Sequence, residues 1–141
     1  MQDNDLNVAN KNEFSAENSI IKINNFIQSN HNDQLKKYIC EIHNADIADI
    51  LHNLEPEIRL ELINRIREDF DPEILTYLND SLREEIVEIL DIKQLATNAK
   101  TLEVDDAVDL VEDLEKSDQT TFLENLEANE RKLIEEGLTY P

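Results

Sequence analysis

Residues 50–66, which read ILHNLEPEIRLELINRI, decide the fold. Their apolar side chains recur at intervals of three and four residues, which is the spacing of one face of an α-helix. Moving on by 24 residues gives residues 74–90, ILTYLNDSLREEIVEIL, with apolar residues at seven matching positions and Arg83 in the position of Arg59. A shift of 60 residues aligns Asp46, Asp49, Leu51, Leu54 and Glu55 with Asp106, Asp109, Val111, Leu114 and Glu115. These repeats predict stacked helix pairs, because each pair needs its neighbours to bury its apolar face.

The same helical spacing extends from Ile20 almost to the C-terminus. One glycine and three prolines in 141 residues are too few for the tight turns of an all-β sandwich or barrel. We therefore expect an all-α fold, a superhelical (α-solenoid or armadillo-like) bundle of about ten short helices with a core mostly of Leu and Ile. Residues 1–16 show no period and are expected to form a disordered or frayed tail, followed by one helical domain over residues 17–141.

Several helix ends carry recognisable signals. Asn44 is expected to cap a helix that turns Ile47, Ile50, Leu51 and Leu54 inward, and Pro56 suits the first turn of the next helix. Ser81 and Glu84 have the spacing of a capping box, in which each side chain satisfies a backbone N–H. Gly137 is the only glycine, and we expect it to end the last helix in the left-handed conformation.

The composition excludes several classes of partner. With 33 Asp and Glu against 13 Lys and Arg, the net charge of −20 repels nucleic-acid phosphates and anionic lipid surfaces. No apolar run approaches the roughly 20 residues that span a bilayer, and the acidic N-terminus is unlike a signal peptide, so we expect a cytosolic chain without membrane insertion. A single cysteine, Cys40, excludes an internal disulfide.

No enzyme motif stands out. His31, His43 and His52 are not spaced to share one helical face, so a zinc site is not predicted. One glycine cannot form a Gly-rich phosphate loop, and no nucleophile elbow is present. A hydrolase using two carboxylates is a third interpretation, although the abundance of acids makes any chosen pair uninformative. We expect that the chain is not an enzyme.

The densest acidic stretch is residues 103–115, with seven acids and no base. On a helix, Asp105, Asp109, Glu112 and Asp113 share one face, opposite the apolar side chains. Like charges at i, i+4 cost roughly 0.2–0.5 kcal/mol each unless a cation neutralises them, and hard divalent cations such as Mg²⁺ prefer oxygen ligands. The alternative is an acidic face that is simply solvated, in which acids of the first turn interact favourably with the helix dipole. This alternative explains Asp109 least well, because Asp109 lies beyond the first turn.

Residues 45–57, ADIADILHNLEPE, and 104–114, VDDAVDLVEDL, resemble the cytosolic N-terminal domain of MgtE-type magnesium transporters. In that family, helices of the form D-x-A-D-x-L-x-x-L-x-P-E and D-D-A-A-D-L-L-E-x-L recur. The resemblance covers roughly residues 30–141. The final residues 138–141 match the junction at which the family continues into a pair of CBS domains, so we expect the chain to be part of a longer transporter.

The resemblance implies a regulatory function. In the family, cytosolic Mg²⁺ sits between acidic surfaces of this domain and the CBS domains, keeping them together and the pore closed, and repulsion separates them when Mg²⁺ falls. By motif position, Asp105 and Asp109 match carboxylates of these interdomain sites, and Glu73 matches another. The resemblance also implies CBS domains of the same chain as partners, a homodimeric full-length protein and a cytoplasmic location at a bacterial inner membrane.

A second interpretation belongs to a different class. Armadillo-like helical repeats also form protein-interaction scaffolds, similar to those of the flagellar motor switch. Continuation of the coding sequence into CBS domains and hydrophobic spans would favour the sensor, whereas a second helical-repeat module would favour the scaffold.

Overall fold

The structure, a computed structural model, describes residues 15–138. Its elements are α2 (Ala16–Gln28), α3 (Asn32–Cys40), α4 (Asn44–Asn53), α5 (Pro56–Ile66), α6 (Asp80–Ile89), α7 (Ile92–Asn98), α8 (Val104–Asp113), α9 (Lys116–Glu124) and α10 (Ala128–Leu138), with 3₁₀ segments η1 (Arg67–Asp69), η2 (Pro72–Tyr77) and η3 (Ala99–Thr101). The tail expected over residues 1–16 lies outside the described residues except for Ser15, which caps α2, and Ala16, which begins it.

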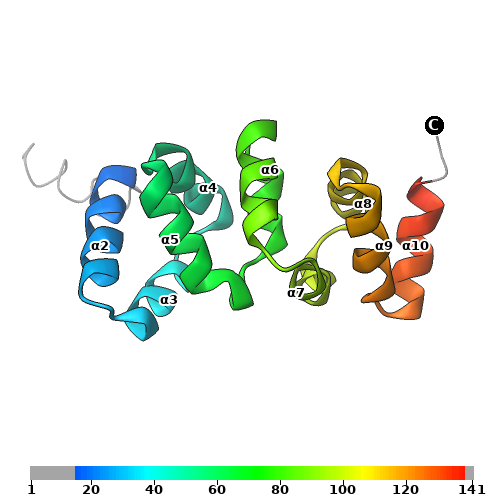
Figure 1. The fold of residues 1–141 in the computed structure, drawn as a ribbon, viewed down its shortest axis with the longest axis horizontal. Helices are drawn as coiled ribbons and strands as arrows, with labels where there is room; N and C mark the ends of the chain where they lie inside the picture. The colour runs from blue at the N-terminus through cyan, green and yellow to red at the C-terminus, as the bar shows by residue number, and fades with distance from the viewer. Residues whose placement is uncertain (1–14, 139–141) are drawn as a thin grey trace, which may run out of the picture.

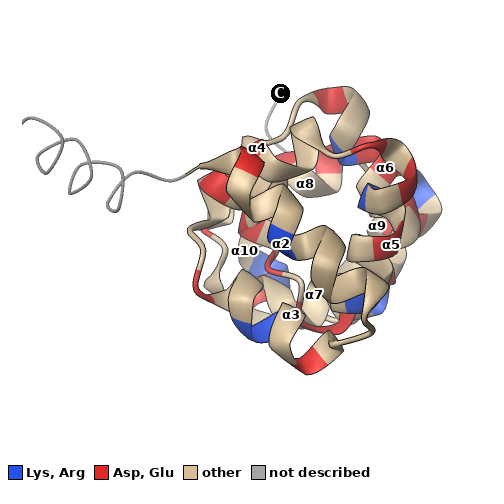
Figure 2. Cartoon of the chain, turned by 90° about the vertical axis from the view of Figure 1, so that its left-hand side faces the viewer, with Lys and Arg blue, Asp and Glu red and all other residues tan. Residues whose placement is uncertain are grey.

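The helices form an elongated row with α2 at one end and α10 at the other (Figure 1). Viewed along the row, α5, α6 and α9 lie on one side, while α4 and α8, which are separated along the row, both project near the top (Figure 2). The helices that the sequence repeat makes equivalent, α5, α6 and α9 in one set and α4 and α8 in another, therefore occupy equivalent positions, as expected for a solenoid. The predicted all-α, superhelical fold is confirmed, and the described residues contain no strand.

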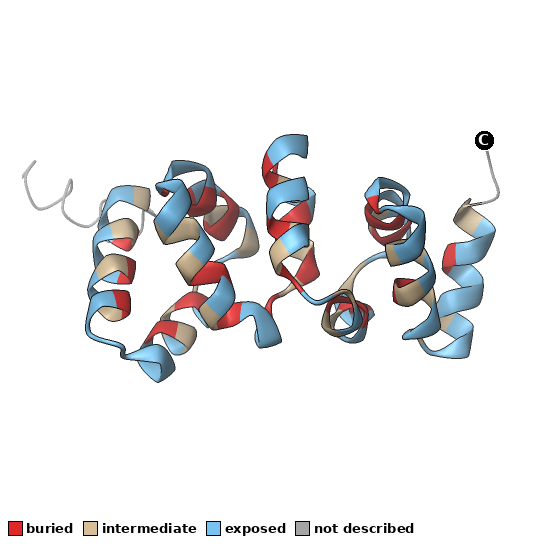
Figure 3. Cartoon of the chain, in the orientation of Figure 1, coloured by how far each residue is buried: buried red, intermediate tan, exposed pale blue. Residues whose placement is uncertain are grey.

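The core runs along the inside of this row. Buried residues lie on the parts of the helices that are turned toward neighbouring helices (Figure 3). Apart from Phe70 and Phe122, the buried apolar side chains are aliphatic, mostly Leu and Ile, as predicted. None of the described helices has both the length and the apolar content that a bilayer-spanning segment needs.

The repeat in the sequence corresponds to a repeated hydrogen bond. Three leucines lie in extended conformation directly after α4, η2 and α8, which are equivalent in the repeat: Leu54 (ψ 147°), Leu78 (ψ 151°) and Leu114 (ψ 153°). Five residues further on, a side chain donates to that leucine's carbonyl oxygen, from Arg59 (3.0 Å), Arg83 (3.4 Å) and Gln119 (3.0 Å). Because terminal helix carbonyls have no partner inside the helix, each of these side chains satisfies a backbone acceptor at the junction.

Two predicted caps are wrong. Asn44 is the first residue of α4 and does not cap it; the N-cap position belongs to His43, which makes no side-chain cap hydrogen bond. The amide of Asn44 instead reaches toward η2. The N-cap of α6 is Asn79, whose Oδ1 accepts from the Leu82 amide at 2.9 Å, so Ser81 lies inside the first turn. Pro56 does occupy the first helical position of α5, as predicted.

The expectation for Gly137 is also wrong. Gly137 lies within α10, and its φ is not positive. A Cβ added at this position would come within 2.5 Å of Val108 Cγ2, far inside van der Waals contact. The glycine is therefore required by the close packing of α10 on α8 and not by a left-handed turn.

This packing predicts the effect of Gly137→Ala. Alanine would gain about 0.5–1 kcal/mol of helix propensity, but forcing a methyl group against Val108 costs about 1–3 kcal/mol, because a β-branched side chain has few alternative rotamers. We expect the free energy of unfolding, measured in urea, to fall by about 1 kcal/mol. In a chain that already carries Val108→Ala, Gly137→Ala should cost less stability than it does in the parent, because the crowded methyl group is gone. If Gly137→Ala stabilises the chain, the close contact is not limiting.

Candidate functional site

The candidate site lies on α8. Its inner side is held in the core by Ala107, Val108, Leu110 and Val111, and it packs against α10 and η2. The side chains of Asp105, Asp109, Glu112 and Asp113 are exposed on the outer side, as the helical spacing predicts. We call these four residues the acidic face.

One member of the acidic face is neutralised by a cation. Arg83 Nη1 lies 2.5 Å from Asp113 Oδ2, and Arg83 Nη2 lies 3.5 Å from Asp80 Oδ1. The Arg83 side chain is only 18% exposed, so its position is fixed by packing. Among the described residues, no ion pair or side-chain hydrogen bond involves Asp105 or Asp109. The negative charge of these two carboxylates is therefore left without a bound cationic side chain.

A small cavity of about 90 Å³ lies where α8 meets η2. Its lining includes Asp106 and Asp109 of α8, Pro72 and Thr76 of η2, and Arg83. Asp109 thus lies beside η2, while Asp105, one turn earlier, faces solvent outside this cavity. The two predicted ligands have different surroundings, because Asp109 lines the same cavity as Arg83 and Asp105 does not.

The third predicted ligand, Glu73, lies in a polar cluster at the start of η2. The Asn44 side-chain amide donates to Asp71 Oδ2 at 3.0 Å and to Glu73 Oε1 at 3.1 Å. Asp71 also caps η2 by accepting from the Glu73 backbone N–H at 3.0 Å. One amide group therefore bridges two half-buried carboxylates. Sequence reasoning missed Asp71 and Asn44, which are 27 residues apart and meet only through the packing of α4 on η2.

The arrangement of these carboxylates fits only a partial coordination sphere for a divalent metal. Within residues 15–138, no three His, Cys, Asp or Glu side chains come close enough together to form a metal-holding group. Glu73 is thus not gathered with Asp105 and Asp109 into one complete site. Mg²⁺ nonetheless commonly takes only one or two protein carboxylates and keeps several waters. Asp105 and Asp109, one helical turn apart and both exposed, fit this partial coordination.

Comparison with known proteins agrees with the fold. Among solved structures, the chain is similar to the soluble part of a magnesium transporter, with a TM-score of 0.71 at 17% identity, covering 90% of this chain and 50% of that one. The chain therefore spans about half the length of that structure. No curated protein matches it in sequence. Residues 42–141, which include α4 to α10, match the family described as the MgtE intracellular N domain. The chain therefore belongs to the MgtE intracellular N domain family.

Proposed function

We propose that this chain is the regulatory, Mg²⁺-sensing domain of a magnesium transporter. One observation carries the proposal: Asp105 and Asp109 lie one turn apart on an exposed face, without a cationic side-chain partner among the described residues, on a helix fixed from its other side by the core. Membership of the MgtE intracellular N domain family and the likeness to part of a magnesium transporter support this function. The family is named for an intracellular domain and not for a catalytic activity.

The proposed mechanism is a population shift. At low Mg²⁺, the acidic face repels an acidic surface of adjoining CBS domains, so the two modules separate and the pore opens. At high Mg²⁺, an ion shared between Asp105, Asp109 and carboxylates of the CBS domains offsets this repulsion and favours the docked, closed state. The ion acts only through its greater affinity for the docked state, because a ligand with equal affinity for both states does not shift the equilibrium between them.

Glu73 provides a second contact in this proposal. It lies on η2, which packs against α8, so both groups can face one partner surface. The Asn44 amide orients the Glu73 carboxylate by donating to Oε1. Its other oxygen remains available to bind an ion or an ion-bound water. Glu73 would therefore extend the docked surface beyond α8.

The remaining parts of the proposal concern the longer protein. The proposed partners are CBS domains of the same chain, in a homodimeric transporter whose regulatory domains lie in the cytoplasm at a bacterial inner membrane. The chain covers 50% of its structural neighbour, and this partial coverage supports a longer protein that could carry these partners.

A paired calorimetric titration tests the function. This chain alone should bind Mg²⁺ weakly, with a dissociation constant of millimolar order or higher, because it offers only part of a coordination sphere. The longer protein with CBS domains should bind measurably more tightly, and Asp105→Ala or Asp109→Ala should each weaken binding about tenfold by removing a carboxylate ligand.

Glu57→Ala is the matched control, because it removes one exposed carboxylate on α5, outside the acidic face. It should change the affinity by less than about twofold, since an exposed charge contributes little at a distance. Equal affinity in the parent and both aspartate variants would remove Asp105 and Asp109 from the site. That result would favour the helical-repeat scaffold instead.

A further inference from the structure

A groove of about 540 Å³ lies on the far side of α6 from α5. α6 packs against α5, and Arg59 of α5 closes that junction by pairing with Glu85. The opposite side of α6 faces the groove, whose other wall is the end of α8 and the start of α9. Here the regular stacking of equivalent helices is interrupted.

The interruption has a cause in the sequence. Arg83 follows its repeat equivalent Arg59 by 24 residues, but Gln119 follows Arg83 by 36. The additional residues form α7 and η3, and Figure 1 shows α7 between α6 and the α8–α9 pair at the lower edge of the row. This insertion separates α6 from α9, so the α5–α6 packing is not repeated. The groove is thus the space beside α6 that the next equivalent helix would occupy in a regular stack.

The groove combines an apolar floor with an acidic rim. The floor includes Val87, Leu90, Ile92, Leu110 and Leu114. The rim carries six carboxylates, those of Asp80, Glu84, Glu88, Asp113, Glu115 and Asp118. Arg83 is the single base in the lining, and it is already paired with Asp113 and Asp80.

The face of α6 turned to the groove has helical spacing. Asp80, Arg83, Glu84, Val87 and Glu88 stand at i, i+3, i+4, i+7 and i+8. A second helix laid along this face would meet its acids and Val87, and beside them the aliphatic side chains of Leu90, Ile92, Leu110 and Leu114. Such a surface complements a helix with Lys or Arg flanking an apolar stripe, since opposite charges favour encounter and apolar contact supplies burial.

We propose that this groove binds a cationic amphipathic helix of a partner. The occupant is not a second copy of this chain, because a chain with 33 acids and 13 bases would bring further negative charge to an acidic rim. Residues 1–14 are equally unsuited, since Lys11 is their only base. Charge complementarity therefore requires a basic segment from elsewhere. The predicted metal ligands Asp105, Asp109 and Glu73 are not in the lining of the groove, although Arg83 lines both the groove and the cavity beside Asp109.

The test uses a fluorescent peptide of about 14 residues whose leucines fall at i, i+3, i+4 and i+7 and whose other positions are mostly lysine. Its affinity for the chain is measured by fluorescence anisotropy at physiological salt. The paired variant Glu84→Gln, Glu88→Gln should weaken binding about tenfold, because both carboxylates lie on the rim. Replacing the peptide's leucines with serine should weaken binding to a similar extent, about tenfold, by removing the apolar contact.

A matched variant separates a specific groove from general attraction to an acidic protein. Glu41→Gln with Glu57→Gln removes the same charge at two exposed residues outside the groove, and it should change the affinity by less than about twofold. Amide NMR shifts caused by the parent peptide should be confined to α6 and to the α6–α7 and α8–α9 junctions. Equal weakening by both paired variants, or shifts spread over the whole acidic surface, would overturn the proposal.

Discussion

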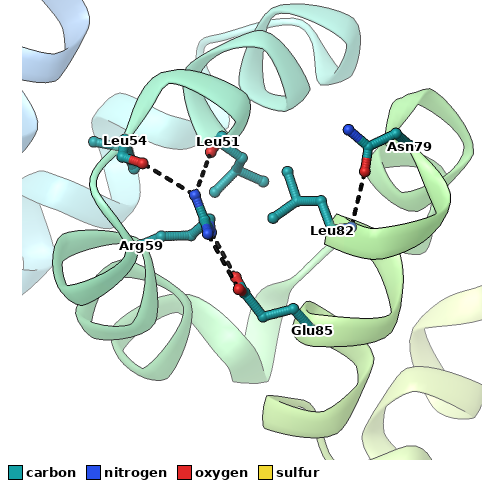
Figure 4. A network of polar contacts seen from close by, with 6 residues as sticks. All are labelled: Leu51, Leu54, Arg59, Asn79, Leu82 and Glu85. Carbon is teal, nitrogen blue, oxygen red and sulfur yellow. Dashed lines mark hydrogen bonds and ion pairs between the residues drawn. The ribbon is translucent and has the colours of Figure 1, made fainter.

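Arg59→Ala is expected to lower the free energy of unfolding by about 2–3 kcal/mol, because it removes several charge-assisted hydrogen bonds at one helix junction. Arg59 Nε and Nη2 donate to the two carboxylate oxygens of Glu85 at 2.6 and 3.1 Å, and Nη1 donates to the carbonyl oxygens of Leu51 and Leu54 at 3.2 and 3.0 Å (Figure 4). The Arg59 side chain is only 11% exposed. Its loss would therefore leave two carbonyl groups at the end of α4 without this donor. Urea unfolding followed by circular dichroism measures the effect.

Two further variants divide this effect into its parts. Glu85→Gln removes only the ion pair and should cost about 0.5–1 kcal/mol, because the Glu85 side chain is 45% exposed and solvent screens the pair. Arg59→Lys keeps the charge but cannot reach a carboxylate and two carbonyls at once, so it should fall between the other two variants. If Glu85→Gln is as costly as Arg59→Ala, the carbonyl hydrogen bonds contribute little to stability.

The ion pair also predicts a pH dependence. The hydrogen bond from Arg59, followed by a smaller electrostatic attraction, lowers the pKa of Glu85 below its ordinary value of 4.5, although desolvation opposes the shift. A carboxylate with a lowered folded-state pKa contributes its stability above its unfolded-state pKa and loses it as pH falls through the folded-state value. The difference between the parent and Glu85→Gln should therefore be full at pH 7 and should shrink below about pH 4.5.

The helices were predictable because their signal is local. Apolar residues at intervals of three and four residues define a helix face without knowledge of its partner. Helix starts were harder, since neighbouring residues compete to cap: Asn79 caps α6 although Ser81 has the expected capping-box spacing. Gly137 was misjudged for a different reason, because the close approach of Val108 arises between helices that are distant in sequence.

The features of the candidate site also separate into those that follow from local helix geometry and those that depend on contacts between distant residues. The exposure of Asp105 and Asp109 follows from helix geometry alone. The pairing of Asp113 with Arg83 joins residues 30 apart in sequence, and no local pattern predicts it. The groove beside α6 also required the structure, because an insertion in a repeat does not reveal whether the inserted helix fills the space that it creates.

The strongest effect on stability is expected from Phe122→Ala. α9 reads KSDQTTFLE, in which Ser, Asp and Thr are poor helix formers, and Phe122 is its only buried residue. Phe122 is fully buried, so truncating it removes apolar contacts and leaves a cavity, at a cost of about 3–5 kcal/mol. Thermal and urea unfolding should both show this loss.

A matched variant tests whether this one side chain fixes α9. Leu123 is adjacent in the helix but only partly buried, so Leu123→Ala should cost clearly less, about 1–2 kcal/mol. Phe122→Leu retains an apolar side chain of intermediate size and should recover much of the lost stability. Equal losses in Phe122→Ala and Leu123→Ala would mean that α9 is held by its whole apolar edge. If Phe122 alone fixes α9, its loss should also displace Glu115 and Asp118, which line the groove at the start of α9. Binding of the lysine-rich peptide to the groove should then weaken in the same variant that loses stability.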